Sequence, residues 1–170
     1  MTNQKNHYLH IICYVVFFIL LFLINYNELF SLKIANASPM LLVPAVITVS
    51  FYYGEWRGFF AGLISGIFID GVASNVTGFN TILLMLIGLI SGLVITHLFN
   101  RNIYSACVLS LIASVIYFGA KWLMEYLFID SADAANYLLF YAAPSAVYTA
   151  LFIIPFYYVG ILINKIKYPQ

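Results

Sequence analysis

Apolar residues fall into six long runs along the chain, and every gap between two runs contains charged residues or the turn-forming residues Asn, Ser and Gly. A transmembrane helix needs about 20 mainly apolar residues to cross the hydrocarbon core of a bilayer, so the pattern predicts one helix per run. The second and third runs are short and the last two are long, which tilted or partly re-entrant helices can accommodate. We therefore predict an all-α polytopic membrane protein, a compact bundle of about six transmembrane helices over residues 8–24, 39–53, 57–72, 81–99, 103–129 and 137–163.

The composition excludes a water-soluble globule. Hydrophobic residues make up 64% of the 170 residues and charged residues only 8%, whereas a soluble domain carries about 25% charged residues. Six spans with short loops use the whole chain, so we expect a single integral-membrane domain over residues 1–170 and no separate catalytic domain. A net charge of +1 with scattered basic residues also excludes a nucleic-acid-binding surface.

The distribution of basic residues predicts the orientation, because cytoplasmic loops are enriched in Lys and Arg. The first run has features of a signal peptide, but it is longer than a usual signal-peptide core, and we interpret it as a retained helix. With the N-terminus inside, both termini are cytoplasmic and only Lys33 is left in an outer loop. Five basic residues then lie on the cytoplasmic side: Lys5, Arg57, Arg101, Lys165 and Lys167.

Glycine recurs every four residues at Gly54, just before the third run, and at Gly58, Gly62 and Gly66 within it, and Asp70 continues the series. At 3.6 residues per turn these positions form one stripe with almost no side chain. Small residues that pack closely hold helices together in lipid, so the stripe predicts either packing within the bundle or a groove for a partner helix. Later runs carry similar stripes at Gly88 and Gly92, at Ala106, Ser110 and Ser114, and at Ala142, Ala146 and Ala150.

A few polar residues near the outer ends of the runs are candidates for a binding site. Asp70 ends a predicted helix, where its charge opposes the helix dipole, so we expect it to be either solvated or paired at an outward-facing site. Lys121 and Glu125 are spaced i,i+4 on one helix face and can pair and snorkel towards the interface. The candidate outer polar site comprises Asp70, Asn75, Asn80, Lys121 and Glu125.

Prolines within the runs predict interruptions of the helices. Pro44, Pro144 and Pro155 lack a backbone N–H and clash with the preceding turn. They are expected to bend their helices or free backbone carbonyl groups, which neighbouring helices then satisfy.

The motifs of soluble and membrane enzymes are missing from the sequence. It contains no phosphate-binding loop, no H-E-x-x-H, no G-x-S-x-G and no Cys/His cluster. Cys13 and Cys107 lie far apart in apolar runs and are interpreted as small buried hydrophobic residues. We therefore expect a protein that is not an enzyme and binds neither a metal nor a cofactor.

The segment Tyr53-Gly54-Glu55-Trp56-Arg57-Gly58, followed by Gly62, Gly66, Asp70, Gly78, Gly88 and Gly92, resembles the rod-shape-determining protein MreD family of bacteria. Length and hydropathy match that family over the whole chain, while the specific motif covers about residues 52–92. Glu55 and Trp56 differ from the Pro and Lys that the family commonly has at these positions, but the Gly and Arg framework is intact.

The resemblance implies a non-catalytic scaffold of the bacterial cytoplasmic (inner) membrane. Such a protein pairs with the bitopic protein MreC and couples MreB filaments to peptidoglycan synthases, and thereby to cell shape. The residues that the resemblance assigns to partner binding and helix packing are Gly54, Arg57, Gly58, Gly62, Gly66, Asp70 and Gly78, to which the stripe on the next run adds Gly88 and Gly92.

A second interpretation belongs to a different class of protein. Size, span number and small-residue faces also resemble the six-span substrate-capture components of energy-coupling-factor vitamin transporters. That function requires an outward-facing polar pocket, whereas an apolar groove favours the scaffold.

Overall fold

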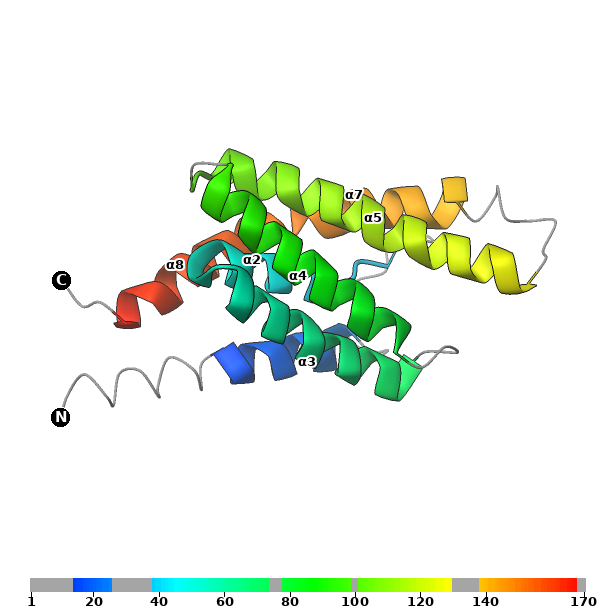
Figure 1. Cartoon of the computed structure of the whole chain (residues 1–170), viewed down its shortest axis with the longest axis horizontal. Coiled ribbons are helices and arrows are strands. Elements are labelled where there is room, and N and C mark those ends of the chain that lie inside the picture. The colour runs from blue at the N-terminus through cyan, green and yellow to red at the C-terminus, as the bar shows by residue number, and fades with distance from the viewer. Residues whose placement is uncertain (1–13, 26–37, 74–77, 99–100, 130–137, 168–170) are drawn as a thin grey trace.

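The computed structural model describes residues 14–25, 38–73, 78–98, 101–129 and 138–167, which form a bundle of helices without strands in these ranges (Figure 1). The expected all-helical fold is thus confirmed for this part of the chain. The helices are Tyr14–Asn25, α2 (Leu42–Tyr53), α3 (Glu55–Ala73), α4 (Phe79–His97), α5 (Ile103–Ile129), the π-helical turn η2 (Leu138–Ala142), α7 (Ala143–Leu151) and α8 (Ile153–Lys167).

Three helical stretches in the described ranges are long and apolar enough to cross a membrane. They are Phe79–His97, Ile103–Met124 and Phe140–Asn164, the last of which combines most of η2 with α7 and α8. Tyr14–Asn25 and α2 are apolar but shorter. The count of six crossings therefore stays a prediction.

The short helix α2 lies at the centre of the bundle. Every residue from Leu42 to Phe51 is buried, as expected for a helix that is hydrophobic on all sides, and α3, α4, α5 and α8 pack around it. Its 12 residues give a length of about 18 Å, well below the roughly 30 Å of a bilayer core. The surrounding helices, not lipid, are the environment of α2.

Side chains from other helices complete the N-terminal end of α2. The Met40 N–H donates to Thr149 Oγ1 of α7 at 2.9 Å, and the Leu41 N–H donates to Asn25 Oδ1 at 3.3 Å. Leu41 is the N-cap residue of α2, and Met40 precedes it. Asn25 and Thr149 therefore fix the short segment that leads into the helix.

The last long helical stretch is interrupted near its prolines, as the sequence predicts. The π-helical turn η2 ends just before Pro144, which stands in the first turn of α7. The chain breaks again at Phe152 between α7 and α8, three residues before Pro155. Each proline removes one helical hydrogen bond, and the breaks lie where those bonds are lost.

Basic residues gather at one end of the bundle, which we name the basic end. Here lie the beginning of Tyr14–Asn25, the α2–α3 turn with Arg57, the segment with Arg101 before α5, and the end of α8 (Figure 1). The far end holds the end of α3, the beginning of α4, the end of α5 and η2.

Candidate functional site

Helices α3 and α4 contact each other through glycine backbone. A Cβ atom added at Gly58 would lie 2.6 Å from the carbonyl oxygen of Gly88 and would overlap Ser50 Oγ of α2. A Cβ atom at Gly88 would in turn overlap the carbonyl oxygen of Gly58. Ser50 Oγ also lies 2.8 Å from the Gly88 carbonyl oxygen, to which it can donate. Three helices therefore meet at a point where only glycine fits on α3 and α4.

The same close approach continues along both helices. A side chain at Gly62 would overlap the backbone of Leu84, one at Gly66 the backbone of Thr81, and one at Gly92 the backbone of Glu55. The glycine stripe of α3 is therefore covered by α4. A partner helix would have to bind another face of this pair.

Two of the glycines assigned by the resemblance have a different role, because no atom lies within 4 Å of a Cβ added at Gly54 or Gly78. Gly54 has φ 87° and forms the turn between α2 and α3, and Gly78 has φ 90° directly before α4. Residues with a Cβ atom rarely adopt such positive φ values. These two glycines therefore determine how the chain enters α3 and α4.

Asp70 binds the N-terminal end of α4. Its Oδ1 accepts hydrogen bonds from the backbone N–H of Asn80 (3.2 Å) and from Asn80 Nδ2 (2.9 Å). Its Oδ2 accepts from the backbone N–H (2.9 Å) and the hydroxyl (2.5 Å) of Thr81. No side chain at Gly78 caps α4, so the carboxylate of α3 takes that role. The positive end of the α4 dipole compensates the charge that is unfavourable at the end of α3.

A buried tyrosine extends this cluster to a third helix. The Tyr117 hydroxyl of α5, a residue that is only 2% exposed, donates to Asn80 Oδ1 at 2.8 Å. Asn80 thus both donates to Asp70 and accepts from Tyr117. The chain of bonds joins α3, α4 and α5 at the far end of the bundle.

The outer polar site predicted from the sequence is brought together only in part. Asp70 and Asn80 are in direct contact, and Lys121 is half-buried on α5. Asn75 and the side chain of Glu125 lie outside the described residues. Thr81 and Tyr117, which belong to the observed cluster, are not part of the sequence-based site. The sequence signal for this cluster is the segment Gly78-Phe79-Asn80-Thr81 at the start of a helix, because glycine has no side chain that could cap the helix.

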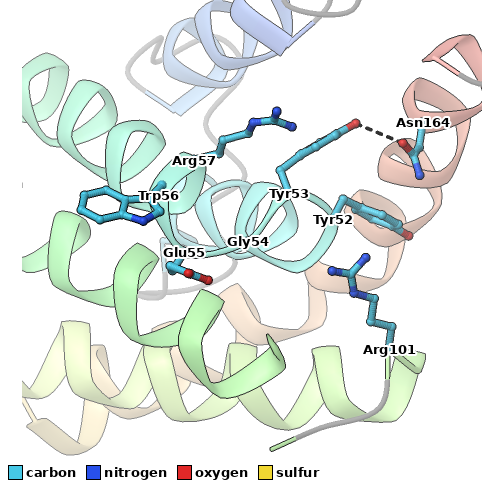
Figure 2. Close-up of a pocket in the computed structure, with 8 residues that line it drawn as sticks. All are labelled: Tyr52, Tyr53, Gly54, Glu55, Trp56, Arg57, Arg101 and Asn164. Carbon is cyan, nitrogen blue, oxygen red and sulfur yellow. Dashed lines mark hydrogen bonds between the residues drawn. The ribbon is translucent and has the colours of Figure 1, made fainter. Parts of the chain in front are cut away.

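A cavity of about 400 Å³ opens at the basic end, at the turn between α2 and α3 (Figure 2). It combines two guanidinium groups, one carboxylate, two tyrosines and an amide, which come from the α2–α3 turn, from the segment before α5 and from α8. The lining residues are Tyr52, Tyr53, Gly54, Glu55, Trp56, Arg57, Arg101 and Asn164.

Tyrosine contacts hold the walls of this cavity. The Arg57 guanidinium lies over the ring of Tyr53, 5.2 Å from its centroid, and the Tyr53 hydroxyl donates to Asn164 Oδ1 at 3.4 Å (Figure 2). The Tyr52 hydroxyl donates to the carbonyl oxygen of Tyr157 in α8 at 3.1 Å. From the sequence, Arg57 is a basic residue of the cytoplasmic side and, through the resemblance, a residue for partner binding, and neither Arg101 nor Asn164 is placed near it.

Within the described ranges, no three His, Cys, Asp or Glu side chains are grouped so that they could hold a metal ion. Cys107 is a half-buried free thiol, and Cys13 lies outside these ranges.

No known protein family, no curated protein and no solved structure matches the chain. In the ranges that the structure describes, the fold defines the class: an all-helical protein with three helical stretches long and apolar enough to cross a membrane.

Proposed function

We propose that the protein is a non-catalytic scaffold of the bacterial cell-elongation complex, located in the cytoplasmic membrane and crossing it six times with both termini inside. It binds an MreC-like bitopic partner and helps to couple MreB-like filaments to peptidoglycan synthesis. The observation that carries the proposal is the α3–α4 pair. The described residues with the MreD-like pattern, 52–73 and 78–92, pack tightly through backbone contacts at Gly58, Gly62, Gly66, Gly88 and Gly92.

Each helix of this pair exposes an apolar side away from the glycine contact. Large exposed side chains follow one side of each helix: Trp56, Phe60, Ile64, Ile67 and Phe68 on α3, and Ile82, Leu86, Ile90 and Leu93 on α4. In lipid, van der Waals packing drives helix association. A face that glycine contacts keep rigid loses little conformational entropy when a partner helix binds to it.

The orientation follows from the charges at the basic end. Arg57 and Arg101 lie there, together with the end of α8 that carries Lys165 and Lys167. Cytoplasmic loops retain basic residues, so the basic end faces the cytoplasm. The partner's cytoplasmic segment then lies on the same side as MreB-like filaments.

Disulfide crosslinking with the partner tests the proposal. The two native cysteines are first replaced, Cys13→Ser and Cys107→Ser. In this background, Ile64→Cys on the exposed side of α3 is combined with single cysteines along the membrane helix of an MreC-like protein from the same genome. We expect a crosslink at Ile64→Cys with a helical periodicity in the partner and none at Val115→Cys, which is similarly exposed on α5. If the two wild-type proteins fail to co-purify from membranes, the proposal is wrong.

The vitamin-binding alternative requires free polar groups in an outward pocket. Asp70 and Asn80, two of the candidates for it, use their polar atoms in bonds between α3, α4 and α5, which favours the scaffold. Titration with water-soluble vitamins provides the test, and micromolar binding of any of them would favour the transport subunit.

A further inference from the structure

The cavity at the basic end has a charge pattern suited to an anion. Arg57 comes from the first turn of α3 and Arg101 from the segment before α5, so two arginines from separate parts of the chain line one space of about 400 Å³. Cavities that bind small molecules have volumes of about 300–1,000 Å³. Guanidinium groups recognise phosphate through paired N–H donors.

Glu55 is the one carboxylate in the lining. Its Oε2 lies 3.4 Å from Thr96 Oγ1 of α4, and Figure 2 shows its side chain directed away from Arg57 and Asn164. Two guanidinium groups against one carboxylate leave the lining with a net positive charge. The Asn164 amide, whose oxygen accepts from Tyr53, adds a neutral N–H donor at its wall, whereas the Tyr52 hydroxyl already donates to Tyr157.

The cavity adjoins a surface suited to acyl chains. Trp56 lines the cavity and is 68% exposed, and tryptophan is enriched where membrane proteins pass from hydrocarbon to headgroups. From Trp56, the exposed side chains of Phe60, Ile64 and Ile67 continue along α3 towards the far end. A molecule with a phosphate in the cavity and hydrocarbon along α3 would match both surfaces. A soluble phosphate would use only the first.

We propose that this cavity binds an anionic phospholipid, with its phosphate between Arg57 and Arg101 and an acyl chain along the exposed side of α3. Basic pockets between membrane helices on the cytoplasmic side are known to hold anionic headgroups. This inference requires that the basic end lies at a membrane surface, and it applies to the protein without its partner, because a partner helix on the same side of α3 would displace the acyl chain.

The two tryptophans of the chain provide a local probe, because Trp56 lies at the cavity and Trp122 lies on α5 towards the far end. The full-length protein with Trp122→Phe, reconstituted in phosphatidylcholine vesicles, is titrated with brominated phosphatidylglycerol or brominated phosphatidylcholine, whose bromine atoms quench tryptophan on contact. The Trp56→Phe protein, which keeps Trp122, is the matched control. We expect brominated phosphatidylglycerol to quench Trp56 at a lower mole fraction than brominated phosphatidylcholine, and the two lipids to quench Trp122 equally.

Charge substitutions then connect the preference to the site. A basic residue near an anionic membrane surface contributes about 1 kcal/mol, so Arg57→Gln and Arg101→Gln should each reduce the preference for phosphatidylglycerol about five-fold. Lys121→Gln removes the same charge about 30 Å away along α5 and should leave it unchanged. Glu55→Gln should increase the preference because it removes a like charge. The circular dichroism spectrum of each variant should match that of the parent.

Several results would overturn the proposal. One is equal quenching of Trp56 by the two lipids, and another is a preference that persists in both arginine variants. Stronger quenching by brominated phosphatidylethanolamine that is lost in Glu55→Gln would assign the cavity to an ammonium headgroup instead. Thermal stabilisation by inorganic phosphate, without any difference between the lipids, would assign it to a soluble anion.

Discussion

Replacing Gly62 by alanine tests the contact between α3 and α4 with the smallest possible change. The new Cβ atom would lie 2.6 Å from the carbonyl carbon of Leu84 and 2.9 Å from the Cα atom of Met85, whereas ordinary contacts lie at 3.4–4 Å. These are backbone atoms and cannot rotate away. The two helices must therefore separate by about 1 Å, which forfeits a quarter to a half of the dispersion energy at each affected contact.

The cost can be isolated by comparison with a second glycine. Gly119 is also helical, on α5, and no atom lies within 4 Å of a Cβ added there. Glycine to alanine in a helix interior stabilises by about 0.5–1 kcal/mol, and this gain is common to both positions. The difference in the free energy of unfolding between Gly62→Ala and Gly119→Ala is then the packing cost alone. Overpacking of a tight contact costs about 1–3 kcal/mol.

Both variants are unfolded by titration with sodium dodecyl sulfate in mixed micelles and followed by circular dichroism. We expect the midpoint of Gly119→Ala to equal or exceed that of the wild type and the midpoint of Gly62→Ala to fall below it. Gly66→Ala, which would meet the backbone of Thr81, should resemble Gly62→Ala. Equal shifts for Gly62→Ala and Gly119→Ala would show that α3 and α4 do not touch through this stripe.

Three further predictions concern the polar cluster and the topology. Asp70→Ala removes the acceptor for the backbone N–H groups of Asn80 and Thr81 and should lower the free energy of unfolding by about 1–3 kcal/mol, while Asp70→Asn, which keeps one acceptor oxygen, should lose less in the same titration. Tyr117→Phe removes the bond to Asn80 and should cost about 0.6 kcal/mol, the average for a hydrogen bond between membrane helices; a larger loss than for Asp70→Ala would contradict the expectation that Asp70 contributes more. Reporter fusions at both termini should read cytoplasmic, and a periplasmic C-terminus is incompatible with six crossings.

The glycine spacing illustrates what a sequence can predict about packing. A stripe at Gly58, Gly62 and Gly66 follows from the helical repeat alone, and so does the conclusion that a backbone can approach it closely. The identity of that backbone does not follow, because a helix of the same chain and a helix of a partner satisfy the pattern equally well. The structure supplies α4, through Gly88 and Gly92.

Asp70 shows a second limit of the sequence. Its position at the end of a helix indicates that something must compensate its charge, but the compensating groups belong to the next helix, ten and eleven residues further on. Local capping rules look within four residues of the helix start. These rules do not detect a carboxylate that caps the helix from the preceding helix.

The cavity at the basic end is the feature that the sequence predicts least well. Arg57, Arg101 and Asn164 are separated by long apolar runs, and the positive-inside rule explains each of the arginines singly. The packing of α5 and α8 against α2, with Gly160 allowing the ring of Tyr52 to lie close, brings the three residues to one space.

The anchoring of the chain before the central helix also has a consequence for the order of assembly. The Met40 N–H finds its acceptor in Thr149, 109 residues later in the chain. At a synthesis rate of about 5–20 residues per second, a span of 109 residues takes about 5–20 s to emerge. During that time α2 is already made, yet the segment that leads into it lacks its final partner. The N-terminal end of the innermost helix is therefore fixed only after most of the chain has been synthesised.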